Sequence, residues 1–276
     1  MSNDDTNRTP PRRTERVRHT IKARKLTVQS VTRVGSTIIR VRFTGDSLHD
    51  FVSASFDDHL KLMLPAPGQA LVLPVAGPER LEFPEGAARP QMRDYTPRSF
   101  DTARGELDIE FALHGDGPAA SWAAQAAPGQ VVGIGGPRGS MVIPMDYAWH
   151  LLVGDDTALP AISRRIEELP AGSKVLAVIE IAEAGDQRAF SGPAAADADV
   201  HWVLRDGQAG ADALAGIVAT LSLPPGEGFA WAAGEAQAIT AVRRVLIEQH
   251  GLHKNQIKAA AYWKHGSVAH HANLED

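Results

Sequence analysis

The sequence has no cysteine among its 276 residues. This absence excludes disulfide bonds, zinc sites made of thiolates and iron–sulfur clusters ligated by cysteine. Any electron transfer by this chain must therefore use an organic cofactor. Histidines are present near the C-terminus, at His265, His270 and His271, but they lie in a polar stretch, so we expect no metal site.

Strong charge and long apolar runs are also missing. The formal net charge of −5 is small for this length, which argues against a broad nucleic-acid-binding surface. No apolar run approaches the roughly 20 residues of a membrane-spanning helix, and the N-terminus lacks the apolar segment of a secretory signal. We expect a cytoplasmic monomer with no nucleic-acid partner and no membrane insertion.

The first half of the chain alternates between apolar and polar residues. Residues 1–18 are polar and arginine-rich, which predicts a disordered tail. Alternation of period two follows, most clearly at residues 39–44, 59–64 and 106–113, and it is typical of half-buried antiparallel strands. Several short strands in succession predict a closed or nearly closed antiparallel β-barrel over residues 19–146.

The pattern changes near residue 148. Segments with helical periodicity, notably 211–221 and 235–250, alternate with short apolar runs at residues 149–153, 174–181, 200–204, 228–232 and 257–262. Strands that alternate with helices predict a parallel sheet, so residues 147–266 are expected to form an α/β domain. Residues 267–276 are expected to form a flexible tail.

One extended stretch of the predicted barrel combines a guanidinium with two hydroxyls. Pro97 disfavours a helical conformation at Thr96, and side chains two apart in an extended chain share a face. Arg93 and Tyr95 can therefore address one ligand, and a planar guanidinium suits a phosphate. The alternative is an arginine-rich surface strand with a packed tyrosine.

Glycines mark two further stretches of the first domain. Gly117 precedes Pro118, which favours a helix start whose free amides would bind an anion. An ordinary capped helix that closes the barrel is the alternative. Residues 133–139 fail the dinucleotide fingerprint, because Arg138 takes the place of the third glycine, and they predict a tight turn between strands.

Two strand ends of the α/β domain carry residues suited to a ligand. Ligands of open α/β sheets bind beyond the carboxyl ends of the strands. Asp155 and Thr157 follow the first strand of this domain, and Gly234 and Glu235 follow the fourth. Simple helix capping explains the acids equally well, and a simple turn explains Gly234.

These motifs, in this order, resemble the siderophore-interacting proteins, a branch of the ferredoxin-reductase-like flavoproteins. The resemblance runs from about residue 19 to residue 266, and Arg93, Tyr95 and Thr96 resemble the family's flavin-binding signature. Asp156 departs from the family pattern, in which glutamate is expected. The other matching stretches are residues 58–62, 114–122, 154–162, 231–235 and 262–266.

The resemblance implies an FAD-containing ferric-siderophore reductase that takes electrons from NADH or NADPH. Arg93 would meet the FAD phosphates, Tyr95 the ribityl or ribose region and Thr96 the flavin ring. No side chain is expected to act as a catalyst, because the flavin mediates the transfer. The implied cofactor-binding residues are Arg93, Asp94, Tyr95, Thr96, His59, His114, Gly117, Pro118, Ala119, Ala120, Trp122, Asp155, Thr157, Ala158, Gly234 and Glu235.

Basic residues are the candidates for binding anionic groups. Ferric siderophores are commonly anionic, so Lys61, Arg138 and Lys264 are expected at the flavin edge, with solvated surface charge as the alternative. Arg188 and Arg205 follow two strands of the α/β domain and could meet the 2′-phosphate of NADPH. Two other functions stay open: an NAD(P)H:flavin or ferredoxin-type reductase with a protein acceptor, and a non-catalytic siderophore-binding module.

Overall fold

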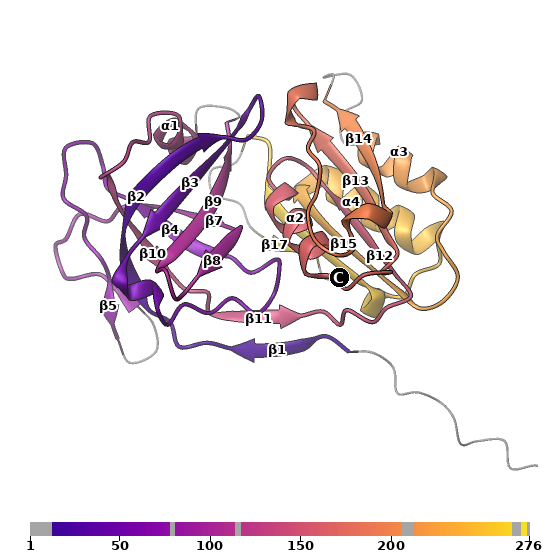
Figure 1. Ribbon diagram of the computed structural model, residues 1–276, viewed down its shortest axis with the longest axis horizontal. Helices are drawn as coiled ribbons and strands as arrows, with labels where there is room; N and C mark the ends of the chain where they lie inside the picture. The colour runs from indigo at the N-terminus through magenta and orange to yellow at the C-terminus, as the bar shows by residue number, and fades with distance from the viewer. Residues whose placement is uncertain (1–12, 78–80, 114–116, 206–211, 267–271, 275–276) are drawn as a thin grey trace, which may run out of the picture.

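The structure is a computed structural model that describes residues 13–77, 81–113, 117–205, 212–266 and 272–274 (Figure 1). A curled antiparallel sheet made of the first half of the chain lies beside an α/β unit made of the second half. No helix in these described ranges is long and apolar enough to cross a membrane.

Seven antiparallel strands form the first sheet, in the spatial order β7, β4, β10, β2, β3, β9, β8. The sheet curls so that β7 and β8 become its two edges, and residues 96–98 connect them. The predicted barrel is therefore open at this seam. The strands are β2 (Ala23–Arg33), β3 (Ile38–Thr44), β4 (Leu60–Leu64), β7 (Gln91–Tyr95), β8 (Ser99–Asp101), β9 (Glu106–Ala112) and β10 (Val131–Gly135).

The alternation seen in the sequence sets the inside of this barrel. Phe43, Leu62 and Phe111 are fully buried and belong to one apolar core, as the pattern predicts. Polar residues between them were expected to face solvent, yet Asp108 and Glu110 are each only 3% exposed. Burial of Glu110 follows from the second domain, which contributes Arg188 to its carboxylate.

The second sheet has the order β14, β13, β12, β15, β16, β17, and its first five strands are parallel. The predicted strands and helices are all found, within a few residues of their expected ends. Strand order reverses between β12 and β15, which is the switch point where such sheets bind ligands. The elements are β12 (Trp149–Gly154), α2 (Leu159–Glu168), β13 (Val175–Ile181), β14 (Ala198–Leu204), α3 (Ala213–Thr220), β15 (Gly228–Glu235), α4 (Ala236–Glu248) and β16 (Ile257–Trp263).

The helices of the second domain cover opposite faces of its sheet. The cluster around α2 includes Ile162 and Ile166 and extends to Ile38 and Phe56 of the barrel domain. The other cluster packs α3 and α4 on the far face of the sheet. Helix α2 therefore lies between the sheet and the barrel, whereas α3 and α4 face away from it.

Both predicted tails contain strands. Within the expected tail 1–18, β1 (Glu15–Arg18) pairs with β11 (Gly139–Val142), and a Cβ at Gly139 would lie 2.5 Å from the Val17 carbonyl oxygen. Within the expected tail 267–276, β17 (Ala272–Asn273) pairs with β16. A hairpin of β5 (Val75–Ala76) and β6 (Leu81–Glu82) was also not predicted. Strands of two to four residues are too short to show an apolar period, so the sequence pattern did not predict them.

Candidate functional site

The motif at residues 93–96 lies at the end of β7, on the edge of the barrel sheet. Tyr95 packs on Phe111 with 4.5 Å between ring centroids, and burial raises the pKa of its hydroxyl well above the ordinary value. The hydroxyl therefore stays neutral and can donate a hydrogen bond. The nearby charge of Arg93 opposes this pKa shift, so the two side chains are neighbours, as the spacing predicts.

Asp94 points toward the adjacent strand. Its carboxylate forms an ion pair with Lys61, its cross-strand partner, at 2.6 Å. The second carboxylate oxygen is buried and has no hydrogen-bond partner among the described residues. A buried acceptor is costly unless something supplies a donor, and a bound cofactor is one such source. The pairing also means that Lys61, expected as a free cation for substrate, shares its charge with Asp94.

Thr96 connects the motif to the second domain. Thr96 is 6% exposed, and its side chain lies next to that of Tyr262 near the end of β16. Burial raises the pKa of the Tyr262 hydroxyl well above its ordinary value. The barrel motif and the carboxyl end of β16 therefore meet at one point.

The glycine-rich loop does open a helix, α1 (Pro118–Ala123), with Gly117 as its N-cap. A Cβ at Gly117 would meet no heavy atom within 4 Å, so space is open in front of this loop. Ala119 is buried, and Trp122 stacks on Phe43 with 6.2 Å between centroids. The remaining residues expected here differ in outcome: Ala120 is half-buried, His59 is exposed and His114 lies outside the described residues.

Both carboxylate oxygens of Asp155 accept hydrogen bonds from groups of the protein itself. One oxygen accepts from the backbone and hydroxyl of Thr157, and the other accepts from the Glu235 amide at 2.9 Å and the Trp263 indole at 2.8 Å. The carboxylate therefore closes the turn before α2 and ties it to the ends of β15 and β16, and it does not cap α2, whose N-cap is Ala158. Gly234 has φ +149°, and a Cβ there would lie 2.6 Å from the same carboxylate. The close approach of Asp155 is by itself enough to require glycine at this position.

Glu235 occupies the start of α4. Its carboxylate accepts from the amides of Gln237 at 2.6 Å and Ala238 at 3.1 Å, and also from the His265 amide at 3.3 Å. These amides are the ones that would otherwise attract an anion. The start of α4 therefore does not offer these amides to a phosphate. Ala158, expected beside these residues, is fully buried at the start of α2.

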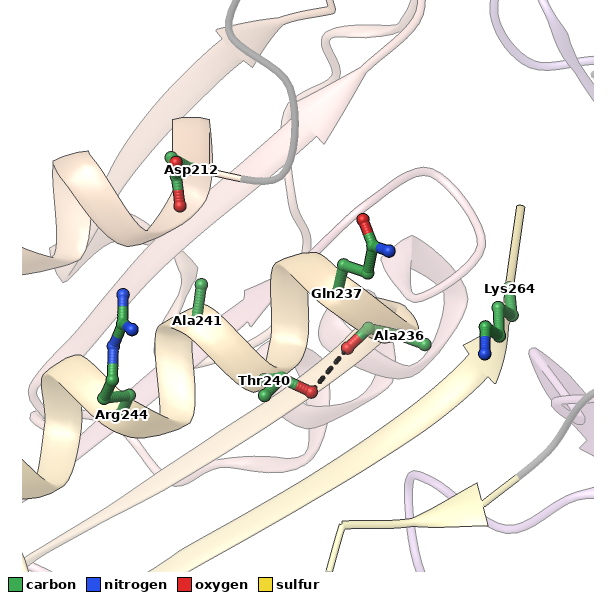
Figure 2. Close-up of a pocket in the computed structure, with 7 residues that line it drawn as sticks. All are labelled: Asp212, Ala236, Gln237, Thr240, Ala241, Arg244 and Lys264. Atoms are coloured by element: carbon green, nitrogen blue, oxygen red, sulfur yellow. Dashed lines mark hydrogen bonds between the residues drawn. The ribbon is translucent and has the colours of Figure 1, made fainter.

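A cleft of about 420 Å³ lies beside α4 (Figure 2). It gathers residues from the carboxyl side of the sheet, because Asp212 precedes α3, Ala236 begins α4 after β15, and Lys264 follows β16. This is the edge at which open α/β sheets bind dinucleotides. The cleft is lined by Asp212, Ala236, Gln237, Thr240, Ala241, Arg244 and Lys264.

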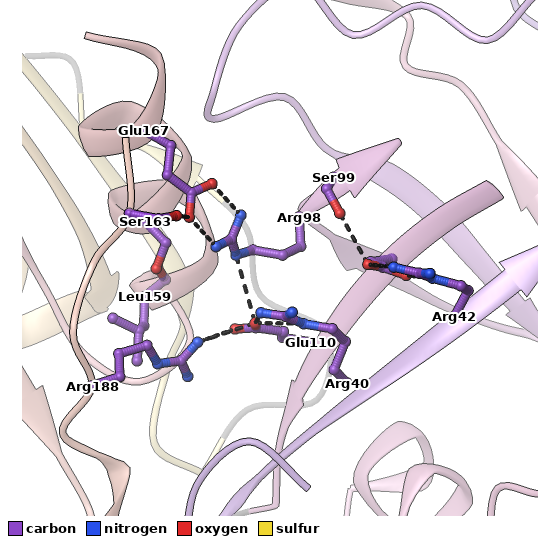
Figure 3. Close-up of polar contacts among 11 residues, drawn as sticks. Arg40, Arg42, Arg98, Ser99, Glu110, Leu159, Ser163, Glu167 and Arg188 are labelled. Atoms are coloured by element: carbon purple, nitrogen blue, oxygen red, sulfur yellow. Dashed lines mark hydrogen bonds and ion pairs between the residues drawn. The ribbon is translucent and has the colours of Figure 1, made fainter. Parts of the chain in front are cut away.

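The two arginines expected to meet a 2′-phosphate are engaged elsewhere. Arg188 donates to Glu110 of the barrel at 2.9 and 3.0 Å, so it lies at the domain interface (Figure 3). Arg205 is paired with Asp156 at 3.1 Å and with Glu180 at 2.5 Å. That expectation is corrected for Arg188, and Arg205 already has two carboxylate partners.

A buried polar network joins the two domains at residues 97 and 98, which follow the barrel motif in the chain. Arg98 donates to Glu167 of α2 at 2.6 and 2.7 Å, while Arg164 of α2 donates to the carbonyl of Pro97 at 3.0 Å. Glu110 also accepts from Arg40, which completes the cluster drawn in Figure 3. The sequence reasoning missed this network. Its signal was the run of charged residues on the polar face of β9.

Matches to known families cover both domains. Residues 147–266 match the family described as "Siderophore-interacting protein", and residues 27–141 match "Siderophore-interacting FAD-binding domain". The chain belongs to the siderophore-interacting protein family. A siderophore-interacting protein of this kind is an FAD-containing oxidoreductase that uses NAD(P)H, as the resemblance implied.

Named relatives cover nearly the whole of this siderophore-interacting protein. An NADPH-dependent ferric-chelate reductase of Escherichia coli is 38% identical over 255 residues, which are 92% of this chain and 97% of that protein. The ferric vibriobactin reductase of Vibrio cholerae is 31% identical, over 84% of this chain and 86% of that one. A siderophore utilization protein from T. fusca has a TM-score of 0.83 and 35% identity, and the match covers 95% and 99% of the two chains.

More distant structures share the fold alone. A ferredoxin reductase of a carbazole 1,9a-dioxygenase has a TM-score of 0.55 at 16% identity. The barrel of this siderophore-interacting protein is therefore ferredoxin-reductase-like. Within the described residues, no group of three or more histidines or carboxylates is arranged to hold a metal ion, and His270 and His271 lie outside them.

Proposed function

We propose that this protein reduces ferric siderophores, passing electrons from NAD(P)H through FAD to Fe(III), so that iron leaves as Fe(II). One observation carries the proposal. The flavin-type motif of the barrel meets the carboxyl end of the parallel sheet where the side chain of Thr96 lies next to that of Tyr262. The two cofactor-binding regions therefore converge, as direct hydride transfer requires.

On the barrel, Arg93 and the loop that begins at Gly117 would hold the FAD phosphates, and Tyr95 would donate its neutral hydroxyl to the ribityl or ribose region. The open space in front of Gly117 and the unmatched oxygen of Asp94 fit a bound cofactor at this edge. Ala119, Ala120 and Trp122 would form the wall of this site. Pro118 would fix the helix start.

On the α/β domain, the nicotinamide end would lie at the switch point between β12 and β15. Asp155 and Glu235 would shape that place through their backbone contacts rather than bind by charge. Thr157 and Gly234 would supply its surface. Asp155 also fixes the indole of Trp263, which follows Tyr262 at the junction with the barrel.

The acceptor site would need cations. Lys61 pairs with Gly135 in the β4–β10 ladder, and exposed Arg138 lies in the turn that follows β10, so these two would be the barrel's contribution to an acceptor site. Lys264 follows the junction strand β16 and is also exposed. When bound, the flavin supplies the conversion of a two-electron hydride into single electrons for ferric iron. We further propose a cytoplasmic monomer, whose oligomeric state light scattering would test.

Anaerobic stopped-flow mixing tests the function. The purified protein, loaded with FAD, should lose its flavin absorbance on mixing with NADPH or NADH and regain it on adding a ferric siderophore, with Fe(II) trapped by ferrozine. Nicotinamide oxidation coupled only to a protein acceptor would instead support a ferredoxin-type reductase. Protein that binds ferric siderophore without taking up FAD would support a non-catalytic binding module.

A further inference from the structure

The cleft in Figure 2 follows one stripe of α4. Gln237, Thr240, Ala241 and Arg244 recur at spacings i, i+3, i+4 and i+7, so they share a helix face. The middle of this stripe carries only short side chains, which leaves the floor of the cleft open. Charged groups stand at its ends, with Arg244 and Asp212 at one end and Lys264 at the other.

Arg244 differs from the arginines beside it. Its side chain is exposed, and the part of the chain that the structure describes offers it no ion-pair or hydrogen-bond partner. By contrast, Arg188 and Arg205 each have a carboxylate partner. Arg244 is therefore exposed and available to a ligand, whereas Arg205 is held by two carboxylates, although its Nη2 has no hydrogen-bond partner among the described residues.

The start of α4 cannot take over this role, because Glu235 caps it. Arg244 lies eight residues beyond Ala236, an axial rise of about 12 Å along the helix. A phosphate bound by Arg244 would thus lie well away from the switch point. Both nicotinamide dinucleotides carry a pyrophosphate, and NADPH has in addition a phosphate on the ribose of its adenosine half, which is the end farther from the nicotinamide.

We propose that Arg244 binds the 2′-phosphate of NADPH, while Asp212 opposes it across the cleft. The proposal rests on the reductase function argued above. A planar guanidinium matches a phosphate, whereas a carboxylate repels it and accepts a hydrogen bond from the free 2′-hydroxyl of NADH. These two side chains then set the nicotinamide preference with opposite signs.

Binding of 2′,5′-ADP and 5′-AMP, measured by calorimetry on the FAD-loaded protein, tests this subsite without turnover. The two compounds differ only in the 2′-phosphate. Arg244→Ala should weaken 2′,5′-ADP about tenfold and leave 5′-AMP unchanged, and Arg244→Lys should lose less. Asp212→Asn should tighten 2′,5′-ADP about threefold. Arg243→Ala, which removes the adjacent arginine, is the matched control and should change neither.

In steady-state kinetics, Arg244→Ala should lower the ratio of kcat/KM for NADPH to that for NADH about tenfold. An unchanged 2′,5′-ADP affinity in this variant, or equal loss of both compounds, would overturn the subsite. Failure of the proposed function looks different. The wild type would then bind 2′,5′-ADP through Arg244 yet reduce no ferric siderophore with either nucleotide.

Discussion

At the interface between the two domains, Glu110 is surrounded by Arg40, Arg98 and Arg188, whereas at the cleft beside α4 a single arginine, Arg244, faces solvent. Glu110 and Arg98 are almost fully buried, with side chains 1% and 9% exposed, whereas the side chain of Arg40 is 32% exposed. Each of these arginines has a carboxylate partner, although Nε of Arg98 and Nε and Nη2 of Arg188 have no hydrogen-bond partner among the described residues. Arg244 has its hydrogen-bonding capacity left for a ligand.

The difference teaches how one residue type serves two purposes. A buried guanidinium without a partner is too costly to retain, so the interface arginines are structural. An exposed one costs little and gains little until a ligand excludes water around it. The barrel motif shows the same contrast. Buried Arg98 is bound to Glu167, whereas half-buried Arg93 makes, among the described residues, a local hydrogen bond to the Met92 carbonyl.

Removing Glu110 should have the largest effect. Glu110→Ala leaves the buried arginines without their shared carboxylate, so the free energy of unfolding should fall by about 3 to 5 kcal/mol. Urea unfolding followed by tryptophan fluorescence measures this. Glu248→Ala removes an exposed glutamate of α4 and should change it by less than about 0.5 kcal/mol. If both variants lost the same free energy of unfolding, burial of Glu110 would not be the cause of its contribution to stability.

The second prediction concerns Arg93, an arginine that we expect to bind a ligand rather than a buried carboxylate. Arg93→Ala should weaken FAD about ten- to a hundredfold, because a charge-assisted hydrogen bond to phosphate contributes about 1.5 to 3 kcal/mol. Flavin fluorescence titration of the apoprotein measures the dissociation constant. Arg89→Ala, an exposed arginine that lies over Phe83, is the control. If the variant kept full flavin occupancy and an unchanged dissociation constant for FAD, Arg93 would not be part of the FAD site.

His150 tests the cost of burying an ionisable group to which no carboxylate is hydrogen-bonded among the described residues. Burial, helped by the nearby charge of Arg165, lowers the pKa of His150 from 6.5 to about 4. The unfolded chain therefore binds the proton more readily, and stability present above pH 6.5 is lost as pH falls toward 4. Between pH 7 and pH 5 the unfolding free energy should drop by about 2 kcal/mol from this group.

The slope in pH is assigned by comparison with His150→Gln, which cannot titrate. Urea unfolding at pH 7, 6 and 5 should show a smaller loss of stability in this variant than in the wild type. Parallel pH profiles for the two proteins would mean that His150 does not carry the effect.

The smallest effect is expected from the exposed lysines. Lys264→Ala should raise KM for an anionic ferric siderophore a few-fold and leave flavin content unchanged, since exposed pairs contribute about 0 to 1 kcal/mol. Lys61→Ala combined with it should exceed either alone, and added salt should shrink the effect. A double variant as active as wild type at low ionic strength would place the acceptor elsewhere.

The sequence by itself determined the elements and the kind of chemistry. Period-two alternation predicted the strands around Phe43 and Phe111, because the inside of a curled sheet requires apolar side chains at every second position. Apolar runs and helical stripes predicted the α/β domain for the same reason. The order of the motifs, from Arg93 to Lys264, carried the family resemblance that the comparisons confirm.

Only the tertiary structure decided which charges are available. Three charged residues of the α/β domain illustrate this: Asp155, Arg188 and Arg244. The sequence around each of them does not indicate whether its charge is used within the protein or left for a ligand. Their roles depend on partners far away in the chain: Trp263 for Asp155, Glu110 for Arg188, and none among the described residues for Arg244. Local periodicity reports burial along one element, but it carries no information about which side chain another element brings opposite.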